Sequence, residues 1–443
     1  MVKLTAFDTG LCELFVKLEN HNPGGSIKDR IGLSIIEEAE KNGALKQGGT
    51  IIEATAGNTG IGLALVSAIK GYKLILVIPD KMSREKILHL EGLGAEVKIT
   101  RSDVSKGHPE YYQDLAKKLA SEIPGAFYAD QFSNPANPLA HSTHTAPEIW
   151  EQMEGKLDAI VGGVGSGGTL TGLAEFFKDK DPNIQMIVAD PEGSVVADAV
   201  TKGTYKYEGG SWFVEGIGED FIPTNLNLGL IDDAVVVSDK EAFKVLRKLL
   251  KEEGILAGSS TGTLISGAIK WCLKQESSKK VVTFVCDTGN KYLSKAFSKS
   301  WLKDNELIEV EGEGNLTDLI SRRADRDEMI SVKSDDTLMT AYNRMRASDI
   351  SQLPVFKDGK LVGMVDEEDL LLNVYREEDL FSKSIESIMV TELETLDVNS
   401  DESLLYETLS KGKVAIIFNK DLFLGFITKV DLINRYKSLF KLS

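Results

Sequence analysis

The chain has 443 residues, which is long for a single hydrophobic core and predicts two or three domains. Its net charge of −17 argues against nucleic acid and against an anionic membrane surface as partners. Only three cysteines occur, and no apolar run is long enough to span a bilayer, so we expect a reducing compartment, with the cytoplasm as the default. The five histidines and three cysteines show no metal-site spacing, and we expect the histidines to be structural or on the surface.

From residue 1 to about 300, short β-branched runs alternate with helical patterns. The expected strands are residues 14–18, 50–53, 74–78, 159–161, 186–188, 235–237 and 281–285, and the expected helices include residues 59–69 and 83–93. Near-continuous apolar strands separated by helices indicate a mostly parallel sheet with helices on both faces. The sequence therefore predicts an α/β fold for this part of the chain.

A polar, charged segment at residues 303–325 is expected to be a linker. After it, residues 352–365 and 414–427 share one pattern of strand, turn and strand, and an acidic-tipped helix follows each. A tandem repeat of this length predicts two small modules packed against each other, which we place at residues 326–378 and 379–443.

Lys28 is expected where a glycine-rich turn leads from a strand into a helix. Gly24 and Gly25 let the backbone approach a ligand closely, and Ser26 can cap the helix. A lysine in a tight, partly desolvated turn can lose its proton and attack a carbonyl group. A lone lysine at a helix start is more often simply solvated, so this interpretation depends on the other motifs.

Two further loops each join an expected strand to an expected helix. Residues 53–60 (EATAGNTG) offer backbone amides and hydroxyls at a helix N-terminus, which suits either a carboxylate cradle or an ordinary capped helix start. Residues 162–169 (GGVGSGGT) could hold a phosphate against the helix dipole, using glycine-freed amides and the hydroxyls of Ser166 and Thr169.

The second loop also supports a rival interpretation. Its glycines, with Asp190 at the end of the next expected strand, match the fingerprint of a nicotinamide-dinucleotide site. An oxidoreductase would leave Lys28 and residues 55–60 without a role, whereas pyridoxal phosphate, with one aldehyde and one phosphate, accounts for both. Thr288, just after a buried strand, could face its ring nitrogen or could be a turn hydroxyl. A neutral partner there favours α,β-elimination and replacement over chemistry that needs a long-lived carbanion.

Together these stretches resemble the fold type II pyridoxal-phosphate enzymes of the cysteine synthase and cystathionine β-synthase family. The matching pieces are residues 24–30, 56–60, 137–141, 165–169, 190–194 and 215–223. The resemblance implies a catalytic domain of two subdomains over residues 1–302. It also implies a lyase that condenses L-serine with L-homocysteine to cystathionine by β-replacement. Within the family, O-acetylserine could be the first substrate, sulfide could be the nucleophile of a cysteine synthase, and a β-eliminating dehydratase is further off.

The resemblance also implies roles for single residues. Lys28 would hold the cofactor through its amine and then shuttle the α-proton, Asn58 would bind the 3′ oxygen of the cofactor, and Thr288 would face its ring nitrogen. The phosphate would lie in a loop made of Gly165, Ser166, Gly167, Gly168 and Thr169. The substrate would be bound by Thr55, Ala56, Thr59, Gln131 and Gly216.

Some positions depart from the family pattern. Ala56 stands where many relatives carry serine, and O-acetylserine, with its better leaving group, would need less help from the site. Phe132 and Glu219 replace family aromatics near the second substrate, tyrosine in the case of Phe132, and Thr288 replaces serine but keeps the hydroxyl. The haem-binding extension of animal relatives does not precede Met1, so we expect no haem. A homodimer or higher homo-oligomer is implied by the family.

The repeats resemble a tandem pair of CBS domains (a Bateman module), which bind adenosyl ligands in several families. Thr428 and Asp431 fit the pattern in which a threonine and an aspartate hold a ribose, whereas Asp366 stands at the threonine position of the first repeat, where it would repel a phosphate. The resemblance implies one allosteric site for S-adenosylmethionine or another adenosyl effector. The alternatives are a ligand-free module for dimer contacts and an adenosyl sensor with an inactive enzyme domain, which the intact Lys28 argues against.

Overall fold

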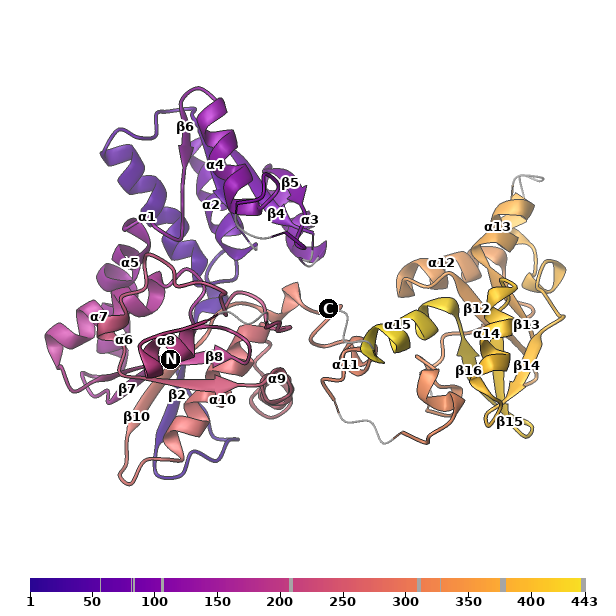
Figure 1. The fold of residues 1–443 in the computed structure, drawn as a ribbon. Coiled ribbons are helices and arrows are strands. Elements are labelled where there is room, and N and C mark those ends of the chain that lie inside the picture. Colours follow the sequence, from indigo (N-terminus) through magenta and orange to yellow (C-terminus); the bar gives the residue numbers. More distant parts are fainter. Residues whose placement is uncertain are drawn as a thin grey trace. The chain divides into compact units, whose positions relative to one another are not determined.

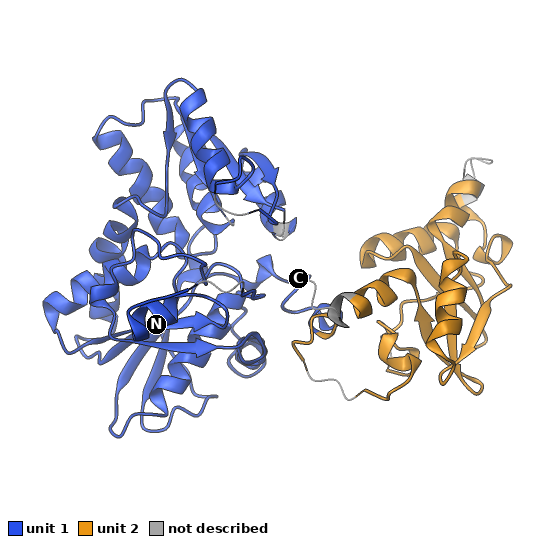
Figure 2. Ribbon diagram, viewed as in Figure 1, with its two compact units in different colours: residues 1–302 blue, residues 303–443 orange. Residues whose placement is uncertain are grey.

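The chain divides into two compact units, residues 1–302 and residues 303–443 (Figure 2). The computed structural model describes residues 1–55, 57–80, 82, 84–104, 107–206, 210–308, 312–326, 328–374 and 380–439. No helix in the described part of the chain has both the length and the apolar surface that crossing a bilayer requires.

The first unit contains two sheets, whose strands are parallel apart from β1 (Figure 1). The six-stranded sheet has the order β1 (Val2–Lys3), β2 (Glu13–Leu18), β10 (Lys280–Val285), β7 (Ala159–Gly162), β8 (Gln185–Pro191) and β9 (Asp233–Val237). The four-stranded sheet has the order β5 (Glu96–Thr100), β4 (Lys73–Pro79), β3 (Thr50–Ala54) and β6 (Ala126–Tyr128). Every strand expected from the sequence lies within one of these elements, which confirms the predicted α/β class.

Helices cover the four-stranded sheet on both faces. Ile51 and Leu76 pack in one cluster with α1 and α2, whereas their strand neighbours Ile52 and Val77 pack in another with α4. Because successive strand residues point to opposite faces, burial on both sides accounts for the continuous apolar runs. The helices of this unit are α1 (Lys28–Lys41), α2 (Asn58–Lys70), α3 (Arg84–Gly92), α4 (Tyr112–Glu122), α5 (Ala136–Ala140), α6 (Ala146–Gln152), α7 (Gly168–Lys180), α8 (Val196–Lys202), α9 (Asp239–Glu253) and α10 (Ser259–Cys272), and α11 (Lys299–Asp304) spans its end.

Helices α1 and α2 meet backbone to backbone. A Cβ atom on Gly32 would lie 2.5 Å from the carbonyl carbon of Gly62, and a Cβ atom on Gly62 would lie 2.6 Å from the carbonyl oxygen of Lys28. A side chain at either position would push the helices apart, because close-packed interiors have no room for it. The first turn of α1, with Lys28, is therefore held against α2.

The second unit contains two three-stranded sheets with one topology. They are β11 (Val332–Lys333), β12 (Gln352–Lys357) and β13 (Lys360–Asp366), and β14 (Glu394–Asp397), β15 (Ala415–Asn419) and β16 (Leu422–Ile427). In each, the first pair is parallel, the second is antiparallel, and the register of the middle strand shifts at the same point. This confirms the predicted repeat. The helices are α12 (Leu338–Ser348), α13 (Glu367–Val374), α14 (Glu402–Ser410) and α15 (Lys429–Leu439).

Each repeat is completed by the segment that precedes the other one. Leu316 and Ile320, in the stretch expected to be a linker, join the core of the second repeat beside Leu396. Val390, which lies before β14 in the predicted second module, exchanges backbone hydrogen bonds of 2.8 and 2.9 Å with Met364 of β13. The two repeats are therefore interleaved in sequence.

Candidate active site

Lys28 and Thr288, both predicted to contact the cofactor, lie together at the carboxyl ends of β2 and β10. The N–H of Ile27 donates to the carbonyl of Cys286 (2.8 Å), and the N–H of Thr288 donates to the carbonyl of Gly25 (2.9 Å). The turn before Lys28 is thus joined by backbone hydrogen bonds to the turn after β10. Ligand sites of α/β sheets characteristically lie at this edge.

The first turn of α1 is fixed from within the glycine-rich turn. The Ser26 hydroxyl accepts the N–H of Lys28 (3.2 Å), although the N-cap of α1 is Ile27 and not, as the sequence had predicted, Ser26. The Asp29 carboxylate accepts the N–H of Gly24 (2.5 Å), and a Cβ atom on Gly24 would lie 2.6 Å from that carboxylate. The turn therefore closes only with glycine at position 24.

The Lys28 amine lies in a site that disfavours its charge. Burial lowers the pKa of Lys28, and the nearby Cys286, Asp287 and Glu219 oppose this only in part. Because the neutral amine is the form that attacks a carbonyl group or accepts a proton, a lowered pKa suits the predicted role.

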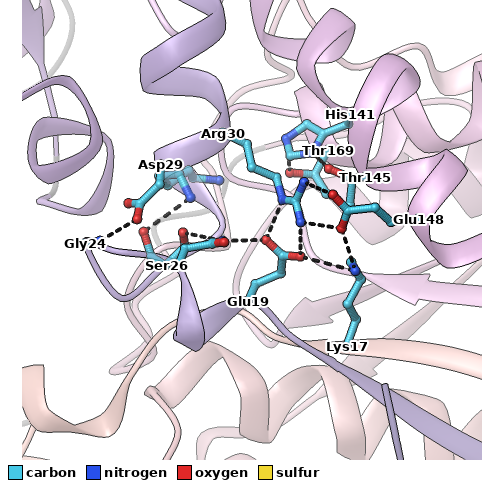
Figure 3. A network of polar contacts seen from close by, with 12 residues as sticks. Lys17, Glu19, Gly24, Ser26, Asp29, Arg30, His141, Thr145, Glu148 and Thr169 are labelled. Carbon is cyan, nitrogen blue, oxygen red and sulfur yellow. Dashed lines mark hydrogen bonds and ion pairs between the residues drawn. The ribbon is translucent and has the colours of Figure 1, made fainter. Parts of the chain in front are cut away.

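A network of ion pairs anchors α1 just beyond Lys28 (Figure 3). Arg30 Nε lies 2.7 Å from Glu19, and Arg30 Nη2 lies 2.6 Å from Glu148. Lys17 Nζ also lies 2.9 Å from Glu148. The hydrogen bond from Arg30 lowers the pKa of the Glu148 carboxyl group to about 2, so Glu148 stays charged at neutral pH.

The residues predicted to bind the substrate carboxylate gather at the N-terminus of α2. The Thr59 hydroxyl donates to Gln131 Oε1 (2.6 Å), and Gln131 Nε2 donates to the backbone at the end of β3 (3.1 Å). The Thr55 hydroxyl accepts the N–H of Gly57 (3.1 Å). The N–H groups of a helix start suit a carboxylate. Ala56, predicted to belong to this set, lies outside the described residues.

Glu53 lies beneath this loop and is fully buried. Its carboxylate accepts the N–H of Ala54 (2.8 Å) and the N–H of Gln131 (3.1 Å), so it joins the end of β3 to the Gln131 turn. Burial raises the pKa of the Glu53 carboxyl group to about 8.

Asn58, predicted to bind the cofactor's 3′ oxygen, has a fixed amide orientation. Lys291 Nζ donates to Asn58 Oδ1 (3.0 Å), and Asn58 Nδ2 donates to Asp287 (2.6 Å). Because an ammonium group can only donate, the amide cannot be flipped. Lys291 also donates to the carbonyl of Gly24 (2.7 Å), and burial lowers its pKa to about 8.

The predicted phosphate loop joins β7 to α7 and is empty of bulky side chains. Gly167 has a φ of +82°, a left-handed conformation that favours glycine. A Cβ atom on Gly165 would lie 2.6 Å from the carbonyl oxygen of Gly216, and one on Gly168 would overlap Oδ1 of Asn137. The loop thus forms a cradle at the N-terminus of a 13-residue helix, which suits a phosphate.

The two hydroxyls of this loop are each held by a buried side chain. Asn137 Nδ2 donates to Ser166 Oγ (2.9 Å). His141 Nε2 lies 3.1 Å from Thr169 Oγ1, and His141 Nδ1 lies 2.9 Å from Thr145 Oγ1 (Figure 3). His141, expected to be structural or exposed, is thus a fully buried part of the site.

The loop around Gly216, predicted to bind substrate, connects the two sheets. Gly216 has a φ of +89°, and the N–H of Gly218 donates to the phosphate loop (2.8 Å). Glu215, in the same loop, pairs with Lys86 of α3 (2.9 Å) and with Lys295 (3.0 Å). Lys86 is only 2% exposed, so this ion pair joins the subdomains beside the site.

Asp190, the acidic residue of the rival dinucleotide interpretation, has a structural role. It is fully buried, and its carboxylate accepts the N–H of Ala197 (2.8 Å) in the first turn of α8. Burial raises its pKa to about 6. A ribose would have to displace this cap, so the geometry does not favour a nicotinamide cofactor. In the described ranges, no three His, Cys, Asp or Glu side chains are placed to hold a metal ion.

The family model described as a pyridoxal-phosphate dependent enzyme matches residues 1–287. The chain belongs to this family. A CBS domain model matches residues 316–376, in the first part of the second unit.

Relatives of this pyridoxal-phosphate-dependent enzyme are similar over different parts of the chain. A cystathionine beta-synthase from Dictyostelium discoideum is 38% identical over 437 residues, which cover 95% of this chain and 87% of that protein. A cysteine synthase from Staphylococcus aureus is 43% identical over 297 residues, covering 66% of this chain and 92% of that one. The chain spans between 53% and 58% of the length of the animal relatives it matches.

Among solved structures, an O-acetylserine dependent cystathionine beta-synthase from Helicobacter pylori is similar to the first unit. It is 40% identical and aligns with a TM-score of 0.58 over 64% of this chain and 90% of that one.

The residues of this pyridoxal-phosphate-dependent enzyme fit the cofactor. Lys28 offers an amine for the aldehyde, and the glycine cradle at α7 offers N–H groups for the phosphate. Thr288 Oγ1 accepts the N–H of Asn290 (3.3 Å), so its own hydrogen is oriented away from that contact and can be donated to a ring nitrogen.

Several buried residues around the site were not assigned from the sequence. Asn137 and His141 lie four residues apart in a helical stretch, a spacing that places two polar side chains on one face. Glu53 ends an apolar strand, and Lys291 lies in the turn after one. In each case, a polar residue in an otherwise buried segment was the feature of the sequence that could have indicated a residue near the site.

In the second unit, Thr428 and Asp431 lie at the start of α15 and contact each other. The backbone N–H and the hydroxyl of Thr428 both donate to Asp431 Oδ2 (2.7 Å each), and the Ser321 hydroxyl donates to the other carboxylate oxygen. In the first repeat, Asp366 takes the same capping position, with its carboxylate accepting the N–H of Asp369 (2.8 Å).

Proposed function

We propose that this enzyme replaces the β-substituent of L-serine with the thiol of L-homocysteine to give cystathionine. The C–O bond at the β-carbon of serine breaks, a C–S bond forms, and water leaves. The observation that carries the proposal is the buried Lys28, whose pKa is lowered, in a turn that backbone hydrogen bonds join to the turn carrying Thr288. The similarity to the Dictyostelium protein over 95% of the chain supports it.

Pyridoxal phosphate, when bound, supplies an aldehyde for amino groups and a ring that draws electrons from the α-carbon. Lys28 would hold the aldehyde through its amine in the resting enzyme, and Lys28 Nζ would remove the α-proton of the substrate and later return it. Burial favours the neutral amine, which this proton transfer requires. Thr288 would face the ring nitrogen with a neutral hydroxyl, which brings no negative charge to hold a proton there and so would favour replacement.

The substrate carboxylate binds at the N-terminus of α2. The Thr59 hydroxyl is already donated to Gln131 Oε1, so the donors for the carboxylate are the backbone N–H groups of the first turn and the second Nε2 hydrogen of Gln131. The α-carbon would then lie between the start of α2 and Lys28, a proposal supported by the backbone carbonyl of Lys28, which lies against α2.

A second candidate keeps the same site and changes the substrates: O-acetylserine would react with homocysteine or with sulfide, and acetate would leave in place of water. The Helicobacter pylori enzyme is described as O-acetylserine dependent, and the Staphylococcus aureus relative as a cysteine synthase. Ala56, where the family pattern has serine, is consistent with a substrate that carries its own good leaving group.

A competition assay separates these candidates. The enzyme receives serine or O-acetylserine together with equal homocysteine and sulfide, and the products are read by mass. Cystathionine from serine supports the first proposal, cystathionine only from O-acetylserine or mainly cysteine supports the second, and no product from any mixture refutes both. K28A, which should lack both activity and the covalently bound cofactor, is the control, and A56S should increase the use of serine if position 56 sets this choice.

We also propose that the second repeat binds an adenosyl ligand such as S-adenosylmethionine through Thr428 and Asp431. A ribose would share the Asp431 carboxylate with Thr428 and Ser321, which makes the first turn of α15 sensitive to the ligand. Calorimetric titration of the full chain tests this. T428A should abolish binding, whereas D366A, altered at the matching position of the first repeat, should not. Binding unchanged in T428A would refute the residue assignment.

A further inference from the structure

Asn137 and His141 face the phosphate loop from one side. Asn137 lies in α5, and His141 begins the π-helical turn His141–Thr145 that continues it, so the two are about one turn apart. Asn137 is 1% exposed and His141 is fully buried. One contacts Ser166 (2.9 Å) and the other contacts Thr169 (3.1 Å), the two hydroxyl residues of the loop. The loop's hydroxyls therefore share a common buried support.

The hydrogen-bond direction at Ser166 follows from a third contact. Asn137 Nδ2 also donates to the backbone carbonyl of Gln131 (2.7 Å), and a carbonyl can only accept. The amide nitrogen must therefore face both groups, and Ser166 Oγ must be the acceptor. The hydrogen of the Ser166 hydroxyl is thus directed to another partner, and an anion in the glycine cradle would accept it.

The direction at Thr169 depends on the tautomer of His141. If Nε2 carries the proton, it donates to Thr169, and the Thr169 hydrogen can point to a phosphate. If Nδ1 carries the proton, Thr169 must donate to Nε2, and its lone pairs face the phosphate instead. The Thr145 hydroxyl at Nδ1 can donate or accept, so it is compatible with both.

We propose that Asn137 and His141 are positioning residues that keep the hydroxyls of Ser166 and Thr169 as acceptors, with the His141 proton on Nε2, so that both hydroxyl hydrogens point at the cofactor phosphate. The inference rests on the proposed role of this loop as the phosphate site. With both hydroxyl hydrogens directed into the loop, the site favours an anion over a cation.

Packing and charge support a fixed, neutral ring. A Cβ atom on Gly172 of α7 would lie 2.9 Å from Cβ of His141 and would overlap the carbonyl oxygen of Pro138, so α7 lies directly against this helix. Single π-helical turns often mark functional positions. Burial lowers the pKa of His141 well below its usual range, and the charges of Lys28 and Arg30 act in the same direction.

The first test reads the tautomer. The full-length holoenzyme is labelled with ¹⁵N-histidine, and the His141 signals are assigned as those lost in H141Q. We expect a protonated Nε2 and an unprotonated Nδ1. A proton on Nδ1, or a doubly protonated ring at neutral pH, overturns the inference.

The second test measures pyridoxal-phosphate binding to resolved full-length enzyme. H141F and T169V should each raise the dissociation constant by about 10- to 100-fold, the range expected for one hydrogen bond to a charged group. H141F/T169V should bind no more weakly than the weaker single variant, because His141 acts through the Thr169 hydroxyl. H141Q, whose amide can donate in place of Nε2, should recover part of the loss, and it remains informative if H141F does not fold.

The outcomes separate the inference from the function on which it rests. H144F is the matched control, since His144 lies on the same turn but is exposed, and its binding should not change. If H141F weakens binding just as much in the T169V background, the coupling is absent and the inference is wrong while the phosphate site stands. If T169V itself leaves binding unchanged, the phosphate site is wrong.

Discussion

Replacing Arg30 with methionine should measure how strongly the ion-pair network stabilises the first unit. Glu19 is 2% exposed and accepts hydrogen bonds of 2.7 and 3.0 Å from Arg30. Without these two hydrogen bonds, the Glu19 carboxylate still accepts a hydrogen bond from the Asn22 amide (2.6 Å), and Lys17 Nζ lies 3.8 Å away. Removing one partner of a buried pair costs about 3–5 kcal/mol. The pair with Glu148, which is 43% exposed, adds about 1 kcal/mol or less.

We therefore expect R30M to lower the free energy of unfolding by about 3–4 kcal/mol, toward the lower end because Lys17 remains. All four tryptophans, at positions 150, 212, 271 and 301, lie in residues 1–302. Urea unfolding followed by tryptophan fluorescence thus reports on the first unit without a signal from the second. Adding E19Q to R30M should recover most of the loss, because it removes the buried charge that R30M leaves without its partner.

The reasoning would be refuted by either of two results. A loss below about 1 kcal/mol for R30M would mean that the network contributes no more than an exposed ion pair. A double variant as unstable as R30M would mean that the loss comes from the packing of the long arginine side chain rather than from the charge of Glu19.

Three further changes have expected outcomes. Because the pKa of Glu53 is raised to about 8, the folded state holds a proton that the unfolded state releases, so the contribution of Glu53 to stability is full below about pH 4 and is lost as the pH rises toward 8. The free energy of unfolding should therefore fall between pH 5 and 8, and E53Q should remove up to about 1.4 kcal/mol per pH unit of this fall in urea unfolding. An unchanged pH dependence in E53Q would contradict this. T288V should weaken cofactor binding about tenfold in apoenzyme titration, as expected for one lost hydrogen bond, whereas unchanged binding would mean that this hydroxyl only serves its own turn. G168A places a Cβ atom on Oδ1 of Asn137 and should cost about 1–3 kcal/mol in thermal unfolding. G92A is the control, because Gly92 is also a helical glycine but has open space around its added Cβ atom.

Local sequence patterns were enough to predict the helices and strands and to predict which residues follow the ends of the strands. The apolar runs gave β3, β4 and β10 nearly to the residue, since burial on both faces leaves a continuous signal. Lys28, Thr288 and the predicted phosphate loop follow neighbouring strands of one sheet, and their common edge was predictable because the turns after parallel strands converge there.

Contacts between distant segments could not be obtained in the same way. The hydrogen bond from Lys291 to Asn58 joins residues more than 200 positions apart, and only the folded packing brings them together. Leu316 and Ile320 lie in a polar stretch too short to show a period, so their place in the core of the second repeat had no signal in the local sequence.

Because the repeats are interleaved, the chain that follows the first unit contributes to the second repeat, at Leu316 and Ile320, before it forms the first. The path from the end of the first unit to the proposed effector residues is therefore shorter than their distance in sequence implies, since Ser321 directly follows this segment and its hydroxyl donates a hydrogen bond to Asp431. A truncation after the first repeat would therefore remove the residues that bury Leu316 and Ile320, and these two apolar side chains would become exposed.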